Sequence, residues 1–360
     1  MINVTQTFLP PLAEYEKQLQ RVWKNKWLTN RGELALELEK KLKDYLQIKA
    51  NILLTTNGTI PLQIALKSLG KGGEIITTPF TYVATTSAIV WEGFTPVFVD
   101  IHPEYLTIDE TKIESAITSK TKAILVVHVY GNPCHAEAIE RIAKKHNLKV
   151  IYDAAHAFGV TYKGKSLFDF GDISTCSFHA TKLFHTGEGG AVFCKDDELF
   201  NELYYRHNFG HKTAISFQGV GINGKMSELQ AAMGLSVLPY MDEIIEKRKQ
   251  IVNYYDELLD FSQLKRQKIR EHTQWNYNYY PVIFKDEETL LRVVDNLNKQ
   301  DIYPRRYFYP SLNTLDYVKY QEMPVSESIA SRVLCLPLYP DLEFEKVKQI
   351  SEFINKNISN

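Results

Sequence analysis

Short apolar runs recur along the first 195 residues of the chain. They are NILLTT (51–56), EIITTP (74–79), TPVFVD (95–100), KAILVVHV (122–129), KVIYDA (149–154), ISTCSFH (173–179) and GAVFCK (190–195). Each run is bounded by Gly, Pro, Asp or Asn, and most are rich in Val, Ile, Thr and aromatic residues, as strands are. The pattern predicts a sheet of seven strands.

Helix-like stretches lie between the earlier runs, at 60–70, 82–93, 109–117 and 135–147. Alternation of strand and helix is typical of βαβ units, in which parallel strands are covered by helices on both faces of the sheet. We therefore expect an α/β fold with a mostly parallel sheet.

The pattern changes after residue 196. Residues 196–207 and 227–259 are predicted to be helices, the second long enough to bridge two domains. From about residue 261 a strand at 279–284 and helices at 287–299 and 343–356 predict a smaller α+β domain. We place the large domain at 1–245 and the small C-terminal domain at 246–360.

Composition narrows the class of protein. The net charge of −1 shows no basic excess for binding nucleic acid. No window offers the ~20 consecutive apolar residues of a membrane span, and the first residues do not resemble a signal peptide. The cysteines at 134, 176, 194 and 335 lack metal-like spacing, so we expect reduced, mostly buried thiols in a cytoplasmic protein.

One short motif suggests a nucleotide triphosphate site. In GVTYKGKS, the residues Gly159, Gly164, Lys165 and Ser166 fit the phosphate-loop pattern. A true phosphate loop leads into a helix, whose N-terminus binds phosphate, but here the following LFDFGDISTCSF runs into a strand. Two short strands joined by a Lys-Gly turn fit these residues better.

Stronger candidates for chemistry flank this motif. Asp153 ends a predicted strand, and the carboxyl ends of parallel strands form the ligand crevice of such sheets. Lys182 lies in a small-residue loop after the next strand, where removal from water favours its neutral, nucleophilic amine. Gly58 and Thr59 stand at a strand-to-helix junction that favours an anion.

Each of these residues alone has an ordinary structural explanation, but their order along the chain suits pyridoxal phosphate. The lysine would hold the cofactor covalently, the acid would pair with the pyridine nitrogen, and the junction would bind the phosphate.

The segments TNGT, TPFTYVATTSAI, YDAAHAFG, SFHATKLFHTGEGGA and GINGKMSELQAAMGL resemble the nucleotide-sugar aminotransferases of the DegT–StrS group. The resemblance runs from WLTNRGELALELEKKL through RRYFYPSL, nearly the whole chain, and is most specific between SFHATK and GEGGA. These are fold-type I pyridoxal phosphate enzymes, so it implies an aspartate-aminotransferase-like fold whose large domain binds the cofactor.

The resemblance also implies residue roles. Lys182 holds the cofactor and moves the proton, Asp153 pairs with the pyridine nitrogen, and His156 lies by the ring hydroxyl. Tyr82 stacks on the ring, with Phe80 as its rival. The remaining cofactor contacts are Gly58, Thr59 and Ser177 at the phosphate, and Asn223 reaching it from the partner subunit of a homodimer.

The implied reaction moves an amino group from L-glutamate to C4 of a nucleotide-linked 4-keto-6-deoxy sugar, with dTDP-4-keto-6-deoxyglucose as the expected acceptor, in deoxyamino-sugar biosynthesis for surface polysaccharide. One branch of the group has histidine in place of the lysine and dehydrates sugars, so Lys182 favours amino transfer. SFHATK resembles the loops of members that act at C4. Candidate sugar-nucleotide contacts are Arg31, Lys212, Lys225, Arg305, Arg306, Tyr309 and His185.

Four alternatives stay open at this point. The acceptor could carry its ketone at C3, or it could be a GDP- or UDP-linked sugar. The protein could be a non-catalytic regulator that binds pyridoxal phosphate. It could also be an ATP-dependent enzyme that uses residues 159–166.

Overall fold

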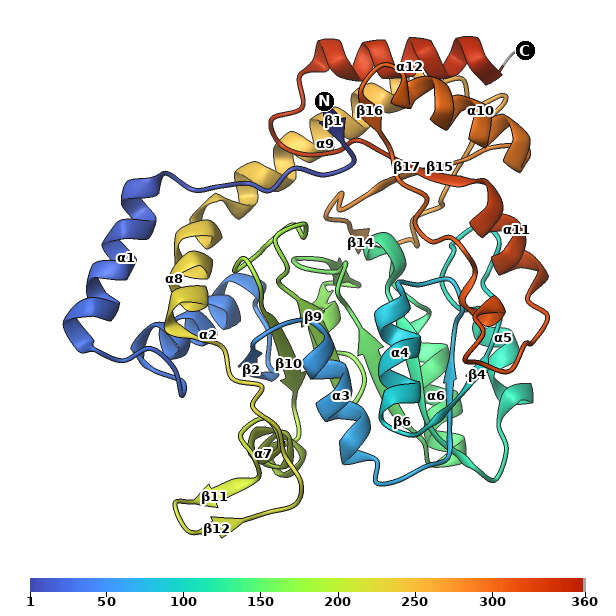
Figure 1. Cartoon of the computed structure of the whole chain (residues 1–360). Helices are drawn as coiled ribbons and strands as arrows, with labels where there is room; N and C mark the ends of the chain where they lie inside the picture. Colours follow the sequence, from blue (N-terminus) through green and yellow to red (C-terminus); the bar gives the residue numbers. More distant parts are fainter. Residues whose placement is uncertain (359–360) are drawn as a thin grey trace.

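A computed structural model describes residues 1–358, and Figure 1 shows a large sheet with helices packed around it. The sheet has seven strands in the order β2-β10-β9-β6-β5-β3-β4, of which only β10 runs antiparallel to its neighbours. Their bounds are β2 Asn51–Thr55, β3 Glu74–Thr77, β4 Thr95–Phe98, β5 Thr121–Val127, β6 Lys149–Asp153, β9 Ile173–Ser177 and β10 Gly190–Cys194. The predicted strands and the mostly parallel sheet are confirmed.

Both faces of this sheet are buried, because side chains alternate along each strand. In β6, Val150 and Tyr152 join one apolar cluster, whereas Ile151 joins the cluster on the opposite face. Continuous apolar runs such as KVIY are the expected signature of strands covered on both sides.

Helices cover both faces of the large sheet. The elements on one face are α2 Glu33–Leu46, α5 Glu110–Ile113 with the 3₁₀ turn η1 Glu114–Ala116, α6 Ala136–His146 and α8 Glu228–Val237. Those on the other face are α3 Thr59–Ser68, α4 Val83–Trp91 and α7 Asp197–Arg206. Helix α1 Leu12–Asn25 packs on α8 from outside.

The C-terminal part has its own antiparallel sheet and core. Its strands are β13 Lys265–Arg266, β15 Tyr280–Ile283 and β17 Val333–Leu336, and its helices are α10 Glu287–Asn298, α11 Pro324–Arg332 and α12 Phe344–Ile358. The first strand of the chain, β1 Ile2–Asn3, pairs with β16 Ile302–Tyr303 in this part. The smaller α+β region expected after residue 261 is therefore present.

The helix predicted over 227–259 is two helices. Helix α8 ends at Val237, the 3₁₀ turn η4 Leu238–Tyr240 follows, and α9 Met241–Leu258 then runs into the C-terminal part. Pro239 lacks the backbone N–H that an uninterrupted helix needs, so the break falls there. Ile244 belongs to the larger core and Ile251 to the C-terminal core, so α9 joins the two; a boundary at 245/246 remains a prediction.

The phosphate-loop match is a β-hairpin. Strands β7 Thr161–Tyr162 and β8 Lys165–Ser166 pair antiparallel, and the turn residues Lys163 and Gly164 both have positive φ, as a tight hairpin turn requires. Strand β14 Thr273–Gln274 adds to β7. After Ser166 comes only the 3₁₀ turn η3 Leu167–Asp169, so the helix that would bind phosphate is missing from this segment and the ATP-dependent alternative is wrong.

Three smaller features complete the fold. The hairpin of β11 His211–Thr213 and β12 Ser216–Phe217 extends away from the body in Figure 1, and two further 3₁₀ turns, η2 Val129–Gly131 and η5 Leu312–Thr314, lie in loops.

All four cysteines are buried and free, as expected of reduced thiols. Within residues 1–358, every helix is too short or too polar to cross a membrane.

Candidate active site

A cavity of about 550 Å³ opens at the carboxyl ends of the parallel strands, where β6 ends at Asp153 and β9 at Ser177. It brings together seven residues expected at the cofactor: Gly58, Thr59, Tyr82, Asp153, His156, Ser177 and Lys182. Among the described residues of a single chain, those that line the cavity do not include Asn223. The strand-end location is the one at which open α/β sheets bind ligands.

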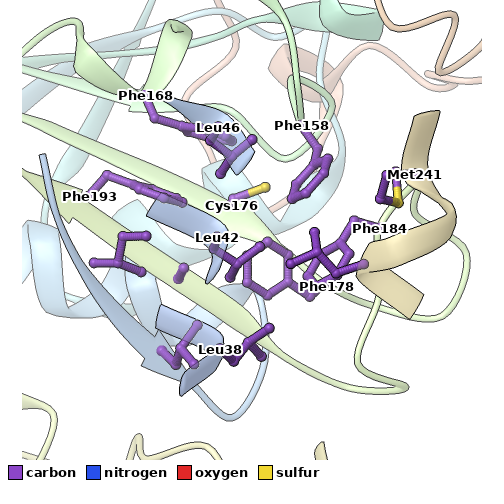
Figure 2. Close-up of a cluster of buried hydrophobic side chains, with 14 of the residues drawn as sticks. Leu38, Leu42, Leu46, Phe158, Phe168, Cys176, Phe178, Phe184, Phe193 and Met241 are labelled. Carbon is purple, nitrogen blue, oxygen red and sulfur yellow. The ribbon is translucent and has the colours of Figure 1, made fainter. Parts of the chain in front are cut away.

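Lys182 lies in a loop that is anchored on both sides. Phe178 and Phe184 flank the loop in sequence, are buried, and pack edge to face at 4.9 Å in the core that Figure 2 shows. The Lys182 amide donates to the carbonyl of His179, which forms a turn. Burial lowers the pKa of the Lys182 amine, because desolvation outweighs the attraction of Asp153. The position favours the neutral, nucleophilic amine.

Asp153 is a buried carboxylate with two donors. The Thr85 hydroxyl, from α4, donates to Oδ2 at 2.8 Å, and the Ala155 amide donates to Oδ1 at 3.1 Å. Burial nevertheless raises the pKa of this carboxyl. A buried acid held in one orientation and aimed at a cavity can accept one further hydrogen bond from a cationic N–H.

His156 is buried and neutral. Its Nδ1 accepts a hydrogen bond from the Tyr130 amide at 3.1 Å, which places the proton on Nε2. Burial, followed by the charge of Lys182, lowers the pKa of the ring well below its ordinary value. Asn276 and Asn278, from the C-terminal part, both donate to the His156 carbonyl. His156 is thus held in place by hydrogen bonds both from the large sheet region and from the C-terminal part.

Gly58 lies against Ser177 at the junction of β2 and α3. A Cβ at position 58 would come within 2.4 Å of the Ser177 Cβ, so only glycine allows this approach. The Asn57 side chain accepts from the amides of Thr59 and Ile60, which caps α3. The N-terminus of α3 and the hydroxyls of Thr59 and Ser177 make an arrangement suited to an anion such as a phosphate.

Tyr82 and Phe80 take different positions. Tyr82 lines the cavity and is 52% exposed in one chain. Phe80 is fully buried and packs against Phe308 and Tyr130 in the core. Tyr82 is therefore the ring available for stacking, and Phe80 is the core aromatic.

Sequence reasoning missed the wall that the C-terminal part contributes. Tyr279, Tyr307 and Phe308 line the cavity opposite the strand ends. The Lys182 amine lies 5.9 Å from the centroid of the Tyr279 ring. Burial raises the pKa of Tyr307 to about 12. These residues are about a hundred or more positions from Lys182, and no motif spacing connects them to it.

His179 and Glu188 also line the cavity without having been expected there. His179 Nε2 lies 3.5 Å from a carboxylate oxygen of Glu188. Both residues belong to the SFHATK-to-GEGG block, so their place in the quoted motif was the available signal.

Of the expected sugar-nucleotide contacts, only Arg305 lines the cavity in one chain. Arg31 forms an ion pair with Glu39, and Arg306 forms one with Glu287. Tyr309 is exposed and lies beneath the Arg306 guanidinium at 3.6 Å.

His185 is 1% exposed and donates from Nε2 to the Phe8 carbonyl at 2.6 Å. The polar contact expected with the sugar is therefore made with the N-terminal segment instead. His185 fastens that segment to the lysine loop.

Lys212, Asn223 and Lys225 gather on and beside the β11–β12 hairpin. Lys212 is exposed on the hairpin. The Lys225 amine donates to the side-chain oxygens of Asn208 at 2.9 Å and Asn223 at 2.7 Å. Within one chain this group is separate from the cavity lining.

Comparison with known proteins agrees over the whole fold. A dTDP-4-amino-4,6-dideoxy-D-glucose transaminase of Shigella dysenteriae is 42% identical over 99% of this chain and 98% of its own. A GDP-perosamine synthase of Escherichia coli O157:H7 is 35% identical over 97% of each chain. The structure of DesI in the presence of its TDP-sugar product has a TM-score of 0.94 at 31% identity, covering 100% of this chain and 93% of that one.

The likeness to DesI confirms the fold that the motif resemblance implied. The family model of the DegT/DnrJ/EryC1/StrS aminotransferases matches residues 12–355, which is nearly the whole sequence. This chain belongs to the DegT/DnrJ/EryC1/StrS aminotransferase family.

Proposed function

We propose that this aminotransferase binds pyridoxal phosphate in the cavity at the strand ends and transfers an amino group from L-glutamate to C4 of a dTDP-linked 4-keto-6-deoxy sugar. One observation supports the cofactor most: a desolvated lysine, a buried carboxylate and an anion-binding helix start converge on one cavity of about 550 Å³.

The residues present fit the cofactor. Gly58, Thr59 and Ser177 would hold the phosphate, since the glycine leaves room for the close approach at that end. Asp153 would hold a proton on the pyridine nitrogen, because an anion buried at this point favours a cationic partner. Tyr82 would cover one face of the ring. When bound, pyridoxal phosphate supplies an aldehyde for the amine and an electron sink for the carbon that loses a proton.

Lys182 would carry out the proton transfers. Once its amine is free, it is a base of lowered pKa inside the cavity, so it can take a proton from the donor carbon and return one to the sugar carbon. Because Lys182 acts from one side, it sets the configuration at the new C–N bond. Transfers of this kind contribute about 10²- to 10⁴-fold to rate.

The choice of acceptor follows the relatives. The Shigella dysenteriae relative is named for a dTDP-linked 4-amino-4,6-dideoxy sugar, and the SFHATK loop here resembles C4 enzymes. GDP-perosamine synthase, which is similar over 97% of this chain, is named for a GDP-linked sugar, so a GDP-linked 4-keto sugar is the alternative acceptor.

A homodimer belongs to the proposal. The β11–β12 hairpin and its flanks expose apolar side chains, with Ile215 at 92% and Val220 at 68%, and such patches mark interaction surfaces. Asn223 follows this hairpin and is outside the lining of its own chain's cavity. Packing of the hairpin on a partner would bury the patch and bring Asn223 toward the partner's phosphate-binding end.

The test is a donor and acceptor panel with the purified protein. With pyridoxal phosphate and L-glutamate, we expect dTDP-4-keto-6-deoxyglucose to yield an aminated sugar nucleotide and one equivalent of 2-oxoglutarate, both measured by mass spectrometry. The C3-ketone isomer and the UDP- and GDP-linked 4-keto sugars should react more slowly. Faster amination of any of these would overturn the acceptor, and release of no 2-oxoglutarate with any acceptor would overturn the function.

A further inference from the structure

The Lys182 amine lies over an aromatic ring rather than beside a carboxylate. Over the described residues 1–358, this amine forms no ion pair and no side-chain hydrogen bond. It lies 5.9 Å from the centroid of the Tyr279 ring. That distance is within the ~6 Å over which an aromatic face attracts a cation. The free amine is therefore placed at the face of Tyr279.

Tyr279 is held in place from several sides. It is buried and directly precedes β15. Its ring packs edge to face on His156 at 4.9 Å and on Tyr307 at 5.5 Å. The Asn278 side chain donates to the His156 carbonyl at 3.2 Å, and the Asn278 carbonyl accepts from Arg248 at 3.0 Å. These contacts fix the ring, so its face stays toward the amine.

The groups that face the Lys182 amine from the other elements offer a released ammonium little support. They are Asp153 of β6, Cys176 of β9, Tyr82 at the start of α4, His156 and Tyr307. Asp153 is the anion of this set, and in the proposed function it is committed to the pyridine nitrogen. Two further charged residues line the cavity, Glu188 and Arg305, and both lie against other side chains. Among the described residues of the lining, the Tyr279 ring is thus the best-placed group to stabilise a positive charge on the amine.

We propose that the Tyr279 ring receives the Lys182 amine each time this amine is released from the cofactor, and holds its charged form until the proton is given up. The inference rests on the proposed function. In each half-reaction the lone pair of the amine takes a proton from carbon, and the electron pair of the broken C–H bond passes to the bound cofactor. The ammonium then gives the proton to another carbon and becomes an amine again. Between the two transfers the cavity contains a cation that needs a partner.

Burial and the aromatic ring act on this amine in opposite directions. Burial lowers the pKa of Lys182, which favours the neutral amine that attacks and takes up a proton. The negative face of an aromatic ring attracts an ammonium, and the attraction is stronger where water is excluded. The ring therefore limits how far the pKa falls, and the amine can carry a proton as well as take one up.

Competitive labelling measures the charge of this amine without turnover. Acetic anhydride reacts with neutral amines, so the rate of acetylation at Lys182 against pH, followed by mass spectrometry, gives its pKa. The measurement is made on holoenzyme converted to its aminated form by L-glutamate, and in parallel on the full chain without cofactor. For Tyr279→Leu we expect the Lys182 pKa to fall by about one unit below that of wild type, because the aromatic face is lost.

Two variants serve as comparisons. Tyr279→Phe should leave the Lys182 pKa unchanged, because it keeps the ring and because the Tyr279 hydroxyl forms no hydrogen bond within the described residues. Tyr303→Leu is the matched control, since it removes an exposed ring of β16 that does not line the cavity. In single turnover with saturating L-glutamate, Tyr279→Leu should be slower by about 3- to 10-fold, whereas both comparison variants should match wild type.

A series that keeps the shape of the ring covers the case in which Tyr279→Leu does not fold. Phenylalanine that carries one, two or three fluorine atoms is incorporated at position 279. Each fluorine weakens the negative face of the ring and changes its size little. The Lys182 pKa should fall stepwise with the number of fluorine atoms, and the single-turnover rate should fall in the same order.

The outcomes separate this inference from the proposed function. If glutamate aminates the cofactor but the Lys182 pKa is the same in wild type, in Tyr279→Leu and across the fluorine series, the inference is wrong and the proposed function stands. An equal fall in Tyr279→Phe and Tyr279→Leu would assign the effect to the hydroxyl and would also overturn the inference. If L-glutamate leaves wild-type holoenzyme unchanged, both proposals fail.

Discussion

Asp153 illustrates how a single residue can be suited to the site and unfavourable for stability. Burial raises its pKa from 3.8, so the folded protein binds a proton here more tightly than the unfolded chain does. The stability from this group is complete below pH 3.8 and is lost as pH rises through the raised folded pKa. At neutral pH the ionised carboxylate therefore destabilises the cofactor-free protein.

We predict opposite effects of Asp153→Asn on stability and activity. Without cofactor, the free energy of unfolding of the variant relative to wild type should increase as the pH rises from 3.8 to neutral, measured by urea denaturation. Amino transfer should fall by about 100-fold or more, since a charge aimed at the cofactor is lost. Asp172→Asn, at the amino end of β9 and so at the end of the strands opposite to the cavity, is the control and should keep full activity. A relative stability of the Asp153 variant that falls as the pH rises from 3.8 to neutral contradicts this account.

The site could be predicted at residues that belong to short ordered motifs. Gly58, Asp153, Ser177 and Lys182 stand at strand ends, where chain order and parallel topology alone bring them together. Tyr279 and Tyr307 reach the cavity through the packing of one part of the chain on another, which local pattern does not encode. His185 was misjudged because a polar residue in a functional loop can serve the loop itself, as its bond to Phe8 shows.

At the scale of elements, the junction of β2 and α3 packs tightly against the end of β9, through the contact of Gly58 with Ser177. Gly58→Ala would place a Cβ 2.4 Å from the Ser177 Cβ, and the backbone φ of −78° at Gly58 adds no strain of its own. We predict that Gly58→Ala lowers stability by about 1–3 kcal/mol through overpacking, measured by urea denaturation, and weakens cofactor retention.

A double variant tests whether the steric clash causes the loss of stability. Gly58→Ala combined with Ser177→Gly removes the Ser177 Cβ and Oγ, at 2.4 and 2.5 Å, and leaves the backbone Cα of residue 177 at 3.0 Å. The double variant should therefore recover part of the lost stability, while cofactor binding stays weak because the hydroxyl is gone. Equal instability of the single and double variants would show that the contact between positions 58 and 177 is not the reason.

Elements were predictable where hydrophobic pattern and length agreed. The seven strands of the large sheet followed from apolar runs of strand length between turn residues. The break at Pro239 was missed because the apolar periodicity continues through it, and the loss of one N–H does not disturb that pattern. The two-residue strands of the C-terminal part form by pairing with distant segments, so local sequence carries little sign of them.

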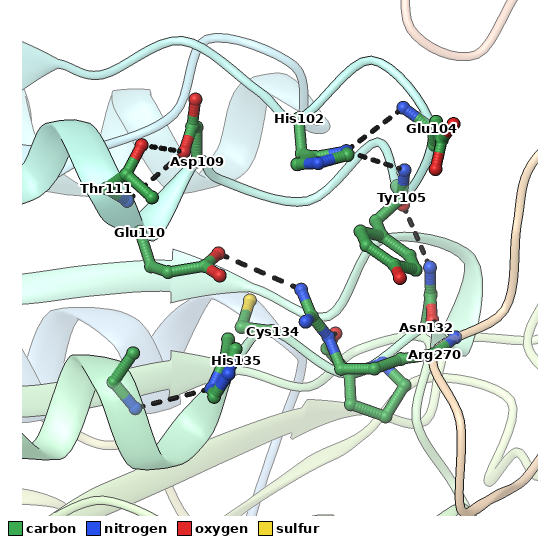
Figure 3. Close-up of polar contacts among 12 residues, drawn as sticks. His102, Glu104, Tyr105, Asp109, Glu110, Thr111, Asn132, Cys134, His135 and Arg270 are labelled. Atoms are coloured by element: carbon green, nitrogen blue, oxygen red, sulfur yellow. Dashed lines mark hydrogen bonds and ion pairs between the residues drawn. The ribbon is translucent and has the colours of Figure 1, made fainter.

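At the scale of the whole molecule, a buried polar cluster joins the C-terminal part to the large sheet (Figure 3). Arg270 lies 3.8 Å from Glu110 and donates to the Pro133 carbonyl, and Asn132 receives the Arg270 amide. The Arg270 side chain is 90% buried, so its loss leaves the Glu110 carboxylate without its charged neighbour in a low-dielectric setting.

We predict that Arg270→Ala destabilises the protein by about 3–5 kcal/mol in urea denaturation, the range for breaking a buried pair. The double variant Arg270→Met with Glu110→Leu should be less destabilised than Arg270→Ala, because it removes both charges and keeps apolar volume. A double variant that is the less stable of the two would mean that the ion pair itself holds the two parts together.

Assembly is the second whole-molecule prediction. Replacing Ile215 and Phe217 by Asp puts charge on the exposed apolar hairpin, so we expect the variant to be a monomer when measured by sedimentation. Its activity should fall below one tenth of that of wild type, because the contact that the partner would make with the phosphate is lost. Leu291→Asp, on the exposed side of α10, is the matched control and should remain dimeric. Active monomers of the hairpin variant would rule out shared sites.

The central claim is that Lys182 carries the cofactor, and chemical trapping tests it most directly. Protein incubated with pyridoxal phosphate is reduced with borohydride, digested, and mapped by mass spectrometry. The account predicts one pyridoxyl group per chain, on the peptide that contains Lys182, and none in Lys182→Ala. A stable label on another lysine, or no label on a protein that transfers amino groups, would contradict it.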